Sequence, residues 1–231
     1  MSTQINEHGQ PMGAPVTSAL PRPRPTRSTL AGRHVQLVPM HPEHADALFD
    51  VFAVDTDGAG WTYMPRGPFT DRADAADWAL ASSASEDPLF FTICRPDGAP
   101  MGFCSFLRIA PEVGSIEVGY IHFGRAMRGT KAATEAMALM MGHALGTLGY
   151  RRYEWKCDAL NAPSRRAAER LGFTYEGTFR QATVVKGRNR DTAWFSIIDS
   201  EWPALKARFD RWLAPENFDA EGRQIHPLNA C

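Results

Sequence analysis

The chain lacks the features that mark secreted, membrane-spanning or disulfide-stabilised proteins. It has no run of about 18 apolar residues, the length that a membrane helix needs. Its first 20 residues hold no apolar stretch long enough for a secretory leader. Its 4 cysteines are few and show no C-x-x-C spacing. We therefore expect a cytoplasmic protein with free thiols and no membrane contact.

The chain also lacks a strong net charge and any common nucleic-acid-binding pattern. Its formal net charge is −1, and no zinc-finger, RRM or basic-zipper pattern occurs, so direct DNA binding is not expected. The charge is nevertheless uneven: residues 121–190 carry 13 basic and 5 acidic side chains, and residues 1–120 carry 8 and 14. A basic segment can bind nucleic acid or a polyphosphorylated cofactor, or simply be a solvated face. A compact anionic ligand fits this segment best.

Sequence composition divides the chain into three parts. No internal repeat occurs, and 44% of the 231 residues are hydrophobic, enough for a substantial core. Residues 1–29 are rich in proline and predict a tail or a surface arm. We expect residues 30–213 to form a single domain and residues 214–231 a C-terminal tail.

Apolar periodicity predicts an alternation of helices and strands in the central part. The predicted order is a strand from 33, a helix at 42–52, an irregular loop at 58–70, a helix at 71–84, strands at 89–94, 100–109 and 115–123, a helix at 132–148, a strand at 152–157, a helix at 161–173, strands at 173–176 and 192–198, and a helix from about 200. The three consecutive strands predict an antiparallel meander.

The segment FGRAMRGTKAATEAMALMM, residues 123–141, combines glycine and positive charge with the start of a helical pattern. The first N–H groups of a helix lack intrahelical partners, and the helix dipole favours negative charge there. The segment therefore predicts an anion site, with phosphate as the candidate ligand.

Three stretches together resemble a known family. They are SIEVGYIHF (115–123), RGTKAATEA (128–136) and NAPSRRAAERLGFTYEGTFR (161–180). In this order they are similar to the GNAT superfamily of acyl-CoA-dependent N-acetyltransferases, in particular its ribosomal-protein and N-terminal acetyltransferase branch. The resemblance implies an α+β GNAT fold, with a central mixed, mostly antiparallel twisted sheet of about seven strands flanked by helices. It also implies acetyl-CoA as cosubstrate and no metal.

The family's phosphate-binding signature, Q/R-x-x-G-x-G/A, aligns with Arg128 to Ala133. Its fourth place is Lys131 instead of glycine, which favours an ordinary helical conformation there, with the ammonium turned toward phosphate. The resemblance implies that this loop holds the pyrophosphate of the cofactor. The cofactor-binding residues that we expect are Ile121, Phe123, Arg125, Arg128, Gly129, Thr130, Lys131, Ala132, Ala133, Asn161 and Ser164.

Acetyl transfer to an amine needs a base, because an exposed aliphatic amine is mostly protonated at neutral pH. In the family a carboxylate on the strand before the loop often acts as this base through water, and Glu117 is the first candidate. Its apolar neighbours Ile116 and Val118 would raise its pKa. Strand alternation could instead turn Glu117 outward into a salt bridge. His122 is the second candidate base.

The departing thiolate has no tyrosine to protonate it, because Ala168 occupies the place where many relatives carry that residue. The branch to which this chain is similar uses a serine or asparagine of the same helix near the sulfur, which makes Ser164 a candidate. Ser164 could equally be an ordinary helix-start residue. No His/Asn arrangement accompanies Cys157, so we expect direct transfer through a ternary complex.

In the family, two loops flank the acceptor. They correspond here to the 58–70 loop and to Lys186-Gly187-Arg188. The substrate-binding residues that we expect are Trp61, Tyr63, Met64 and Phe69. A protein N-terminus and a small amine both remain open as acceptors.

The alternatives to an N-acetyltransferase are a catalytically degenerate CoA-binding sensor and an RNA- or ribosome-associated protein. The apolar last helix makes a homodimer possible, and the HPEH motif at 41–44 is interpreted as a helix start and not as a metal site.

Overall fold

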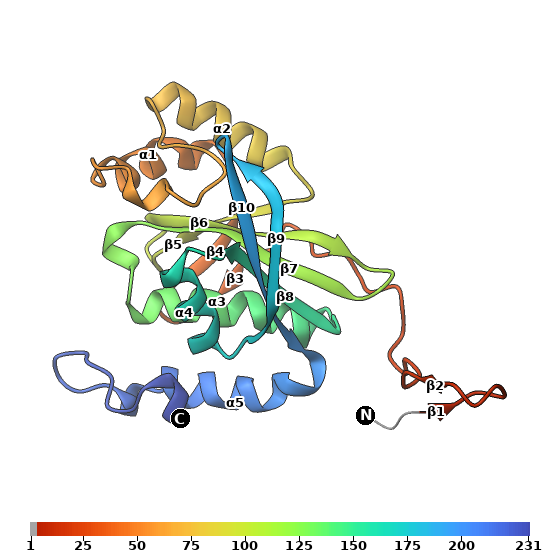
Figure 1. The fold of residues 1–231 in the computed structure, drawn as a ribbon. Helices are drawn as coiled ribbons and strands as arrows, with labels where there is room; N and C mark the ends of the chain where they lie inside the picture. The colour runs from red at the N-terminus through yellow and green to blue at the C-terminus, as the bar shows by residue number, and fades with distance from the viewer. Residues whose placement is uncertain (1–3) are drawn as a thin grey trace.

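An eight-stranded sheet forms the centre of the computed structural model, which describes residues 4–231 (Figure 1). The strand order is β3-β4-β5-β6-β7-β8-β10-β9, and every neighbouring pair is antiparallel except β7 and β8. The α+β class and the mixed, mostly antiparallel sheet are confirmed. The short edge strand β3 (Leu30–Ala31) belongs to this sheet, which has one strand more than the seven expected.

The other strands of the sheet are β4 (Gln36–Pro39), β5 (Leu89–Cys94), β6 (Pro100–Ala110), β7 (Ser115–Phe123), β8 (Arg152–Asp158), β9 (Thr174–Val185) and β10 (Arg188–Ile198). The helices are α1 (Ala45–Ala53), α2 (Arg72–Ala84), α3 (Lys131–Met141), α4 (Ala162–Leu171) and α5 (Trp202–Leu213). A separate two-stranded sheet joins β1 (Gln4–Ile5) to β2 (Pro11–Met12). Within the described residues, no helix is both long and apolar enough to cross a membrane.

Helices cover the sheet on both faces, with α1 and α2 on one face and α3 and α4 on the other, and α5 packs against α3 (Figure 1). Side chains of a strand alternate between the two faces. Phe91 and Phe106 therefore belong to the large core around α3 to α5, whereas Phe90 and Phe103 belong to a smaller core under α1 and α2. The expected meander is confirmed, since β5, β6 and β7 pair in succession.

Among the described elements, α3 and β9 differ most in length from the sequence prediction. The α-helix expected over 132–148 ends at Met141 and continues as a π-helical turn, Gly142–Thr147, whose glycines lie against the indole of Trp202. The strand expected at 173–176 extends to Val185 and forms a long hairpin with β10, because Lys186 and Gly187 turn the chain with φ of 50° and 71°. Most of β9 is exposed, so apolar alternation could not reveal its length.

Strands β7 and β8 separate halfway along. They pair only from Ser115–Arg152 to Val118–Trp155. Beyond that point β7 carries a bulge, at which Tyr120 has a φ of +49° and one residue more than on β6 fits between two paired positions. β8 continues beside β10 alone. A gap between neighbouring strands results, and β7 leads from it directly to α3.

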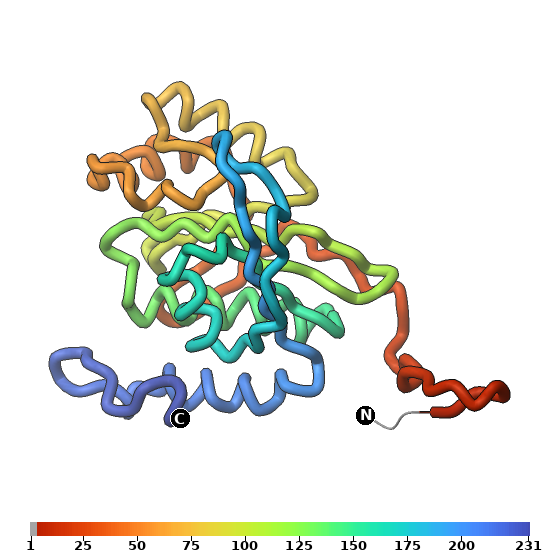
Figure 2. The backbone as a smooth tube through the Cα atoms, in the orientation of Figure 1, coloured from red at the N-terminus to blue at the C-terminus, as the bar shows by residue number. Residues whose placement is uncertain are grey.

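The N-terminal and C-terminal segments that the structure describes differ in how closely they pack on the domain (Figure 2). Residues 4–19 extend away from the sheet, and the next residues return to the surface, where the Arg22 N–H donates to Pro111 O at 3.0 Å. Residues 214–231 pack beside α5, with Asn217 and Leu228 buried. Asn217 bonds to Trp212 O at 3.0 Å and to His226 O and N at 3.1 and 2.9 Å.

Replacing Asn217 by alanine is expected to lower the free energy of unfolding by about 2–3 kcal/mol, because it leaves buried backbone groups without partners. Urea denaturation measures the loss. The control is Glu216→Ala, at the exposed neighbouring position. Equal stability of the two variants would contradict the anchoring role of Asn217.

Candidate functional site

The segment between β7 and α3 forms a tight loop that ends in a side-chain cap. Thr130 is the N-cap residue: its Oγ1 accepts from the Ala133 N–H at 3.4 Å and donates to Met127 O at 2.7 Å. Gly129 has a φ of +75°, which favours glycine. Lys131 is the first residue of α3, in line with the ordinary helical conformation expected from the sequence.

Backbone donors gather at this loop. Among residues 4–231, none accepts a hydrogen bond from the N–H groups of Gly129, Lys131 or Ala132. Unpaired N–H groups at a helix N-terminus favour an anion through both hydrogen bonding and the helix dipole. The loop therefore has the donors that a phosphate group needs.

The cationic side chains of the loop point in different directions. Arg125 is exposed, whereas Arg128 is held by Phe123 O, 3.0 Å from its Nε, and by Asp55 Oδ2, 2.5 Å from its Nη2. The Lys131 ammonium lies 4.1 Å from the ring centroid of Phe218, in the C-terminal segment. Arg128 and Lys131 are thus engaged by protein groups, and the backbone supplies the donors. Three further expected residues, Ile121, Phe123 and Ala132, are partly buried against the large core.

α4 begins shortly after β8, the strand on the other side of the gap. Asn161 caps α4, with Oδ1 accepting from the Ser164 N–H at 3.2 Å, and Gly172 ends it at a φ of +99°. The Ser164 hydroxyl accepts from Trp155 Nε1 of β8 at 3.0 Å. Ala168 is fully buried, so no polar side chain replaces the absent tyrosine at that position.

Glu117 is buried and ion-paired at the same time. Its side chain is 4% exposed, and Oε2 lies 2.7 Å from Arg108 Nη1 and 2.9 Å from Lys156 Nζ. Burial raises the pKa of Glu117, and the charges and hydrogen bonds of Lys156 and Arg108 oppose the rise. Lys156 also contacts Glu154 at 2.7 Å and lies 3.7 Å from the ring centroid of Trp194. Glu117 is thus part of a charged network on the sheet face opposite α3.

His122 lies in the smaller core, between the rings of Phe52 and Trp61, with centroids 4.3 and 4.2 Å away. Its Nε2 has no hydrogen-bond partner among the described residues. Burial, followed by the charge of Arg128, lowers the pKa of His122 to about 4, while Asp55 has a small opposite effect. His122 is therefore neutral at pH 7.

The two loops expected at the acceptor meet in space. Lys186 Nζ, at the tip of the β9–β10 hairpin, donates to Trp61 O at 2.6 Å. The Tyr63 hydroxyl donates to Leu160 O, just before α4, at 3.2 Å. Trp61 and Phe69 are buried in the smaller core, and Met64 packs partly against it.

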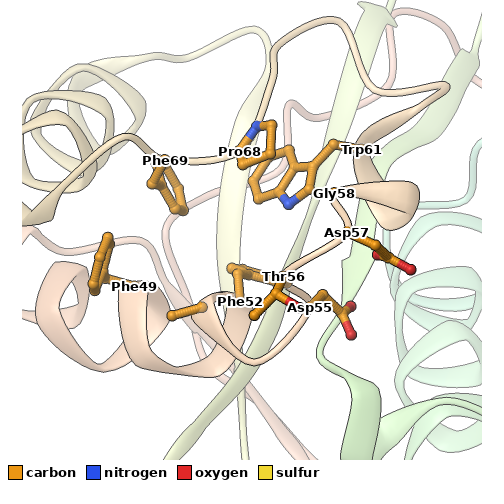
Figure 3. A pocket seen from close by; sticks show the side chains of 10 residues that line it. Phe49, Phe52, Asp55, Thr56, Asp57, Gly58, Trp61, Pro68 and Phe69 are labelled. Atoms are coloured by element: carbon orange, nitrogen blue, oxygen red, sulfur yellow. The ribbon is translucent and has the colours of Figure 1, made fainter.

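Figure 3 shows a cavity of about 330 Å³ between α1 and the 58–70 loop. Phe49, Phe52, Trp61 and Phe69 supply its rings, and Asp55 and Asp57 lie at one end. We call it the aromatic cavity. Phe49 and the two aspartates are site residues that no motif in the sequence marks. The DTDG turn at 55–58 is the available signal, since acidic residues beside a glycine turn are typical of loops.

Comparisons with known proteins identify the family. The model of the acetyltransferase (GNAT) domain matches residues 34–174, more than half of the chain. The chain belongs to the GNAT acetyltransferase family. The crystal structure of a GCN5-related N-acetyltransferase from Brucella melitensis is 47% identical, with a TM-score of 0.90, over 93% of this chain and 98% of that one. The expected GNAT fold is confirmed.

Two curated proteins that are named acetyltransferases are also similar to this chain. The uncharacterized N-acetyltransferase p20 of Bacillus licheniformis is 30% identical over 178 residues, which are 75% of this chain and 98% of that protein. The ribosomal-protein-serine acetyltransferase of Escherichia coli is 30% identical over 102 residues, 44% of this chain and 56% of that protein. The gap between β7 and β8 lies within the region that the GNAT family model matches.

The two histidines of the HPEH motif form hydrogen bonds at the start of a short helix. His41 caps the short helix Pro42–His44, and its N–H donates to His44 Nδ1 at 3.1 Å. His44 Nδ1 also lies 2.8 Å from Thr92 Oγ1. Within residues 4–231, no group of three or more potential metal ligands occurs.

The buried neutral state of His122 predicts a pH dependence of stability. Between the ordinary value of 6.5 and the folded-state pKa of about 4, the unfolded chain binds a proton that the native chain does not. Wild-type stability therefore falls as the pH falls through this window, by on the order of 3 kcal/mol from this group. In urea titrations at several pH values, His122→Gln should lose this component. Parallel curves for the two proteins would contradict it.

Proposed function

We propose that the protein is an acetyl-CoA-dependent N-acetyltransferase that transfers the acetyl group directly to a primary amine in a ternary complex. The observation that carries the proposal is the set of unpaired N–H groups at Gly129, Lys131 and Ala132, beside the gap between β7 and β8. A diphosphate on these groups suits a cofactor whose thioester end extends into the gap.

The residues present fit acetyl-CoA, which supplies the activated acetyl group. The backbone from Gly129 to Ala133 holds the pyrophosphate, with the exposed Arg125 nearby. The end of β7, from Ile121 to Phe123, offers backbone groups to the acyl carbonyl. Asn161 and Ser164 face the gap from the other side. Lys131 contributes its backbone N–H, whereas the N–H of Arg128 donates to Arg125 O at 3.4 Å. The side chains of Arg128 and Lys131 are held by Asp55 and Phe218.

Glu117 is the proposed base, acting through water. Its Oε2 is held by Arg108 and Lys156, and Oε1 accepts no hydrogen bond from any residue between 4 and 231. This free oxygen can accept the proton that the ammonium loses before attack. His122 is the weaker candidate, because its low pKa makes it a poor proton acceptor at pH 7 and it lies among the rings of the smaller core.

Ser164 is the proposed group at the departing sulfur. Its oxygen already accepts from Trp155 Nε1, so its own O–H remains to donate. The thiolate of CoA is also a tolerable leaving group, since ordinary thiols have a pKa of about 8.5. We therefore assign Ser164 a supporting role, and a Ser164→Ala enzyme should keep part of its activity.

The proposed acceptor is a protein N-terminus or a small amine. The name of the Escherichia coli relative supports a protein acceptor. The acidic first half of the chain favours a cationic acceptor of either kind. A CoA-binding sensor without turnover is the second candidate, favoured by Lys131 in the signature and by buried Ala168 in α4.

Replacing Glu117 by glutamine tests the proposed base. With acetyl-CoA and an amine panel, wild type should release free CoA about 10²–10³ times faster than Glu117→Gln. The wild-type rate should fall at low pH as Glu117 binds a proton, and the variant should lack this acidic limb. Equal rates would exclude Glu117 as the base, and CoA binding without turnover by wild type would favour the sensor.

Direct transfer predicts that Cys157→Ala keeps most of its activity. Burial raises the pKa of the Cys157 thiol, so the nucleophilic thiolate is disfavoured, although Ser164 and nearby arginines oppose the rise. Steady-state rates and mass spectrometry of the enzyme after mixing with acetyl-CoA provide the test. An inactive variant together with an acetylated Cys157 in wild type would refute direct transfer.

A further inference from the structure

The aromatic cavity has the walls of a cation site. The ring centroids of Phe52 and Trp61 are 5.3 Å apart, as are those of Trp61 and Phe69. Aromatic faces attract ammonium and guanidinium groups because their quadrupole is negative above the ring. One of these rings already contacts a cation, since the Arg66 guanidinium lies 4.4 Å from the centroid of Phe69.

A carboxylate at the end of the cavity has an acceptor to spare. The side chain of Asp55 is only 10% exposed, and Arg128 bonds to Oδ2 alone. Among the described residues, none donates a hydrogen bond to Asp55 Oδ1. Asp55 Oδ1 is not among the fully buried atoms, so it stays accessible to a donor in the cavity. Asp57 lines the same end and uses Oδ1 to cap the Ala59 N–H at 2.9 Å.

Most cations near the cavity contact groups other than its two carboxylates. Arg128 contacts Asp55, and Arg66 is paired with Asp74 at 2.5 Å. His122 packs against the cavity rings Phe52 and Trp61 and is neutral at pH 7. Lys186 Nζ donates to Trp61 O at 2.6 Å, and no hydrogen bond or ion pair joins Lys186 or Arg66 to Asp55 or Asp57 among the described residues. These two carboxylates therefore keep acceptor positions that favour a cationic ligand.

We infer that the aromatic cavity binds an alkylammonium group, with Asp55 Oδ1 accepting its N–H and the rings enclosing its alkyl part. The identity of this group as part of the acceptor rests on the proposed function. The reacting amine must be neutral, so the group in the cavity is a second, charged amine. The assigned substrate class is small diamines and polyamines, because 330 Å³ is at the small end of ligand sites.

Binding can be tested without turnover, in the absence of acetyl-CoA. The probes are n-pentylamine, charged at pH 7, and n-pentanol, its neutral counterpart of similar size. The NMR signal of the Trp61 indole N–H, assigned with a Trp61→Phe variant, reports occupancy. Pentylamine should bind about tenfold or more tightly than pentanol. Equal affinities, or no shift with either probe, would overturn the inference.

The carboxylate has a matched control. Asp55→Asn should remove the preference for pentylamine over pentanol. Asp50→Asn makes the same change of charge on α1, where Asp50 is exposed and paired with Arg72, and should keep the preference. A preference that survives Asp55→Asn would overturn the role of Asp55. If Asp55→Asn fails to fold by circular dichroism, the wild-type comparison of the two probes still decides the inference.

Turnover separates this inference from the proposed function. Pentane-1,5-diamine should have a KM about tenfold below that of n-pentylamine in wild type and Asp50→Asn, and the two values should converge in Asp55→Asn. If acetyl-CoA is turned over but the two amines have equal KM values, the inference fails and the proposed function stands. If no amine is acetylated, the proposed function fails, and the binding comparison still decides the cation site.

Discussion

The structure depends on one constraint: within residues 4–231, the first N–H groups of α3 have no carbonyl to bind. The first N–H groups of a helix cannot pair within that helix, and the Thr130 cap satisfies only that of Ala133. The large core around α3 holds the helix start at the end of β7. The unpaired donors are therefore fixed in position, and an anion would bind to them with little rearrangement.

The separation of β7 and β8 gives this helix start its surroundings. A fully paired sheet would place β8 beside the end of β7. Instead, the pairing of β7 with β8 stops at Val118–Trp155, just before the bulge at Tyr120. Different polar side chains then lie near the gap on the two faces of the sheet. Ser164 lies on the face of α3 and α4, whereas Glu117 and its charged partners lie on the opposite face. A thioester in the gap would thus have Ser164, the proposed group at the departing sulfur, on one side of the sheet. Glu117, the proposed base for the acceptor amine, would lie on the other side.

The sequence predicted the elements whose pattern is local. Apolar, β-prone runs located β5 to β7, and the cap residues Asn161 and Gly172 marked both ends of α4. It could not show that Arg128 turns to Asp55, more than 70 residues earlier in the chain, or that Lys131 packs on Phe218. These pairings depend on tertiary contacts, which no local periodicity records. Glu117 combines both interpretations made from the sequence: it is buried, and it is also in a salt bridge.

A titration of acetyl-CoA by calorimetry tests the central claim, that backbone donors and not side chains hold the diphosphate. Proline at position 131 removes one N–H yet suits the first position of a helix, and the extended conformation of Thr130 suits a residue before proline. Lys131→Ala removes only the ammonium. We predict that Lys131→Ala binds like wild type and that Lys131→Pro, folded with an unchanged melting temperature, binds about tenfold more weakly. Equal binding by wild type and Lys131→Pro, or a loss confined to the lysine side chain, would contradict the account.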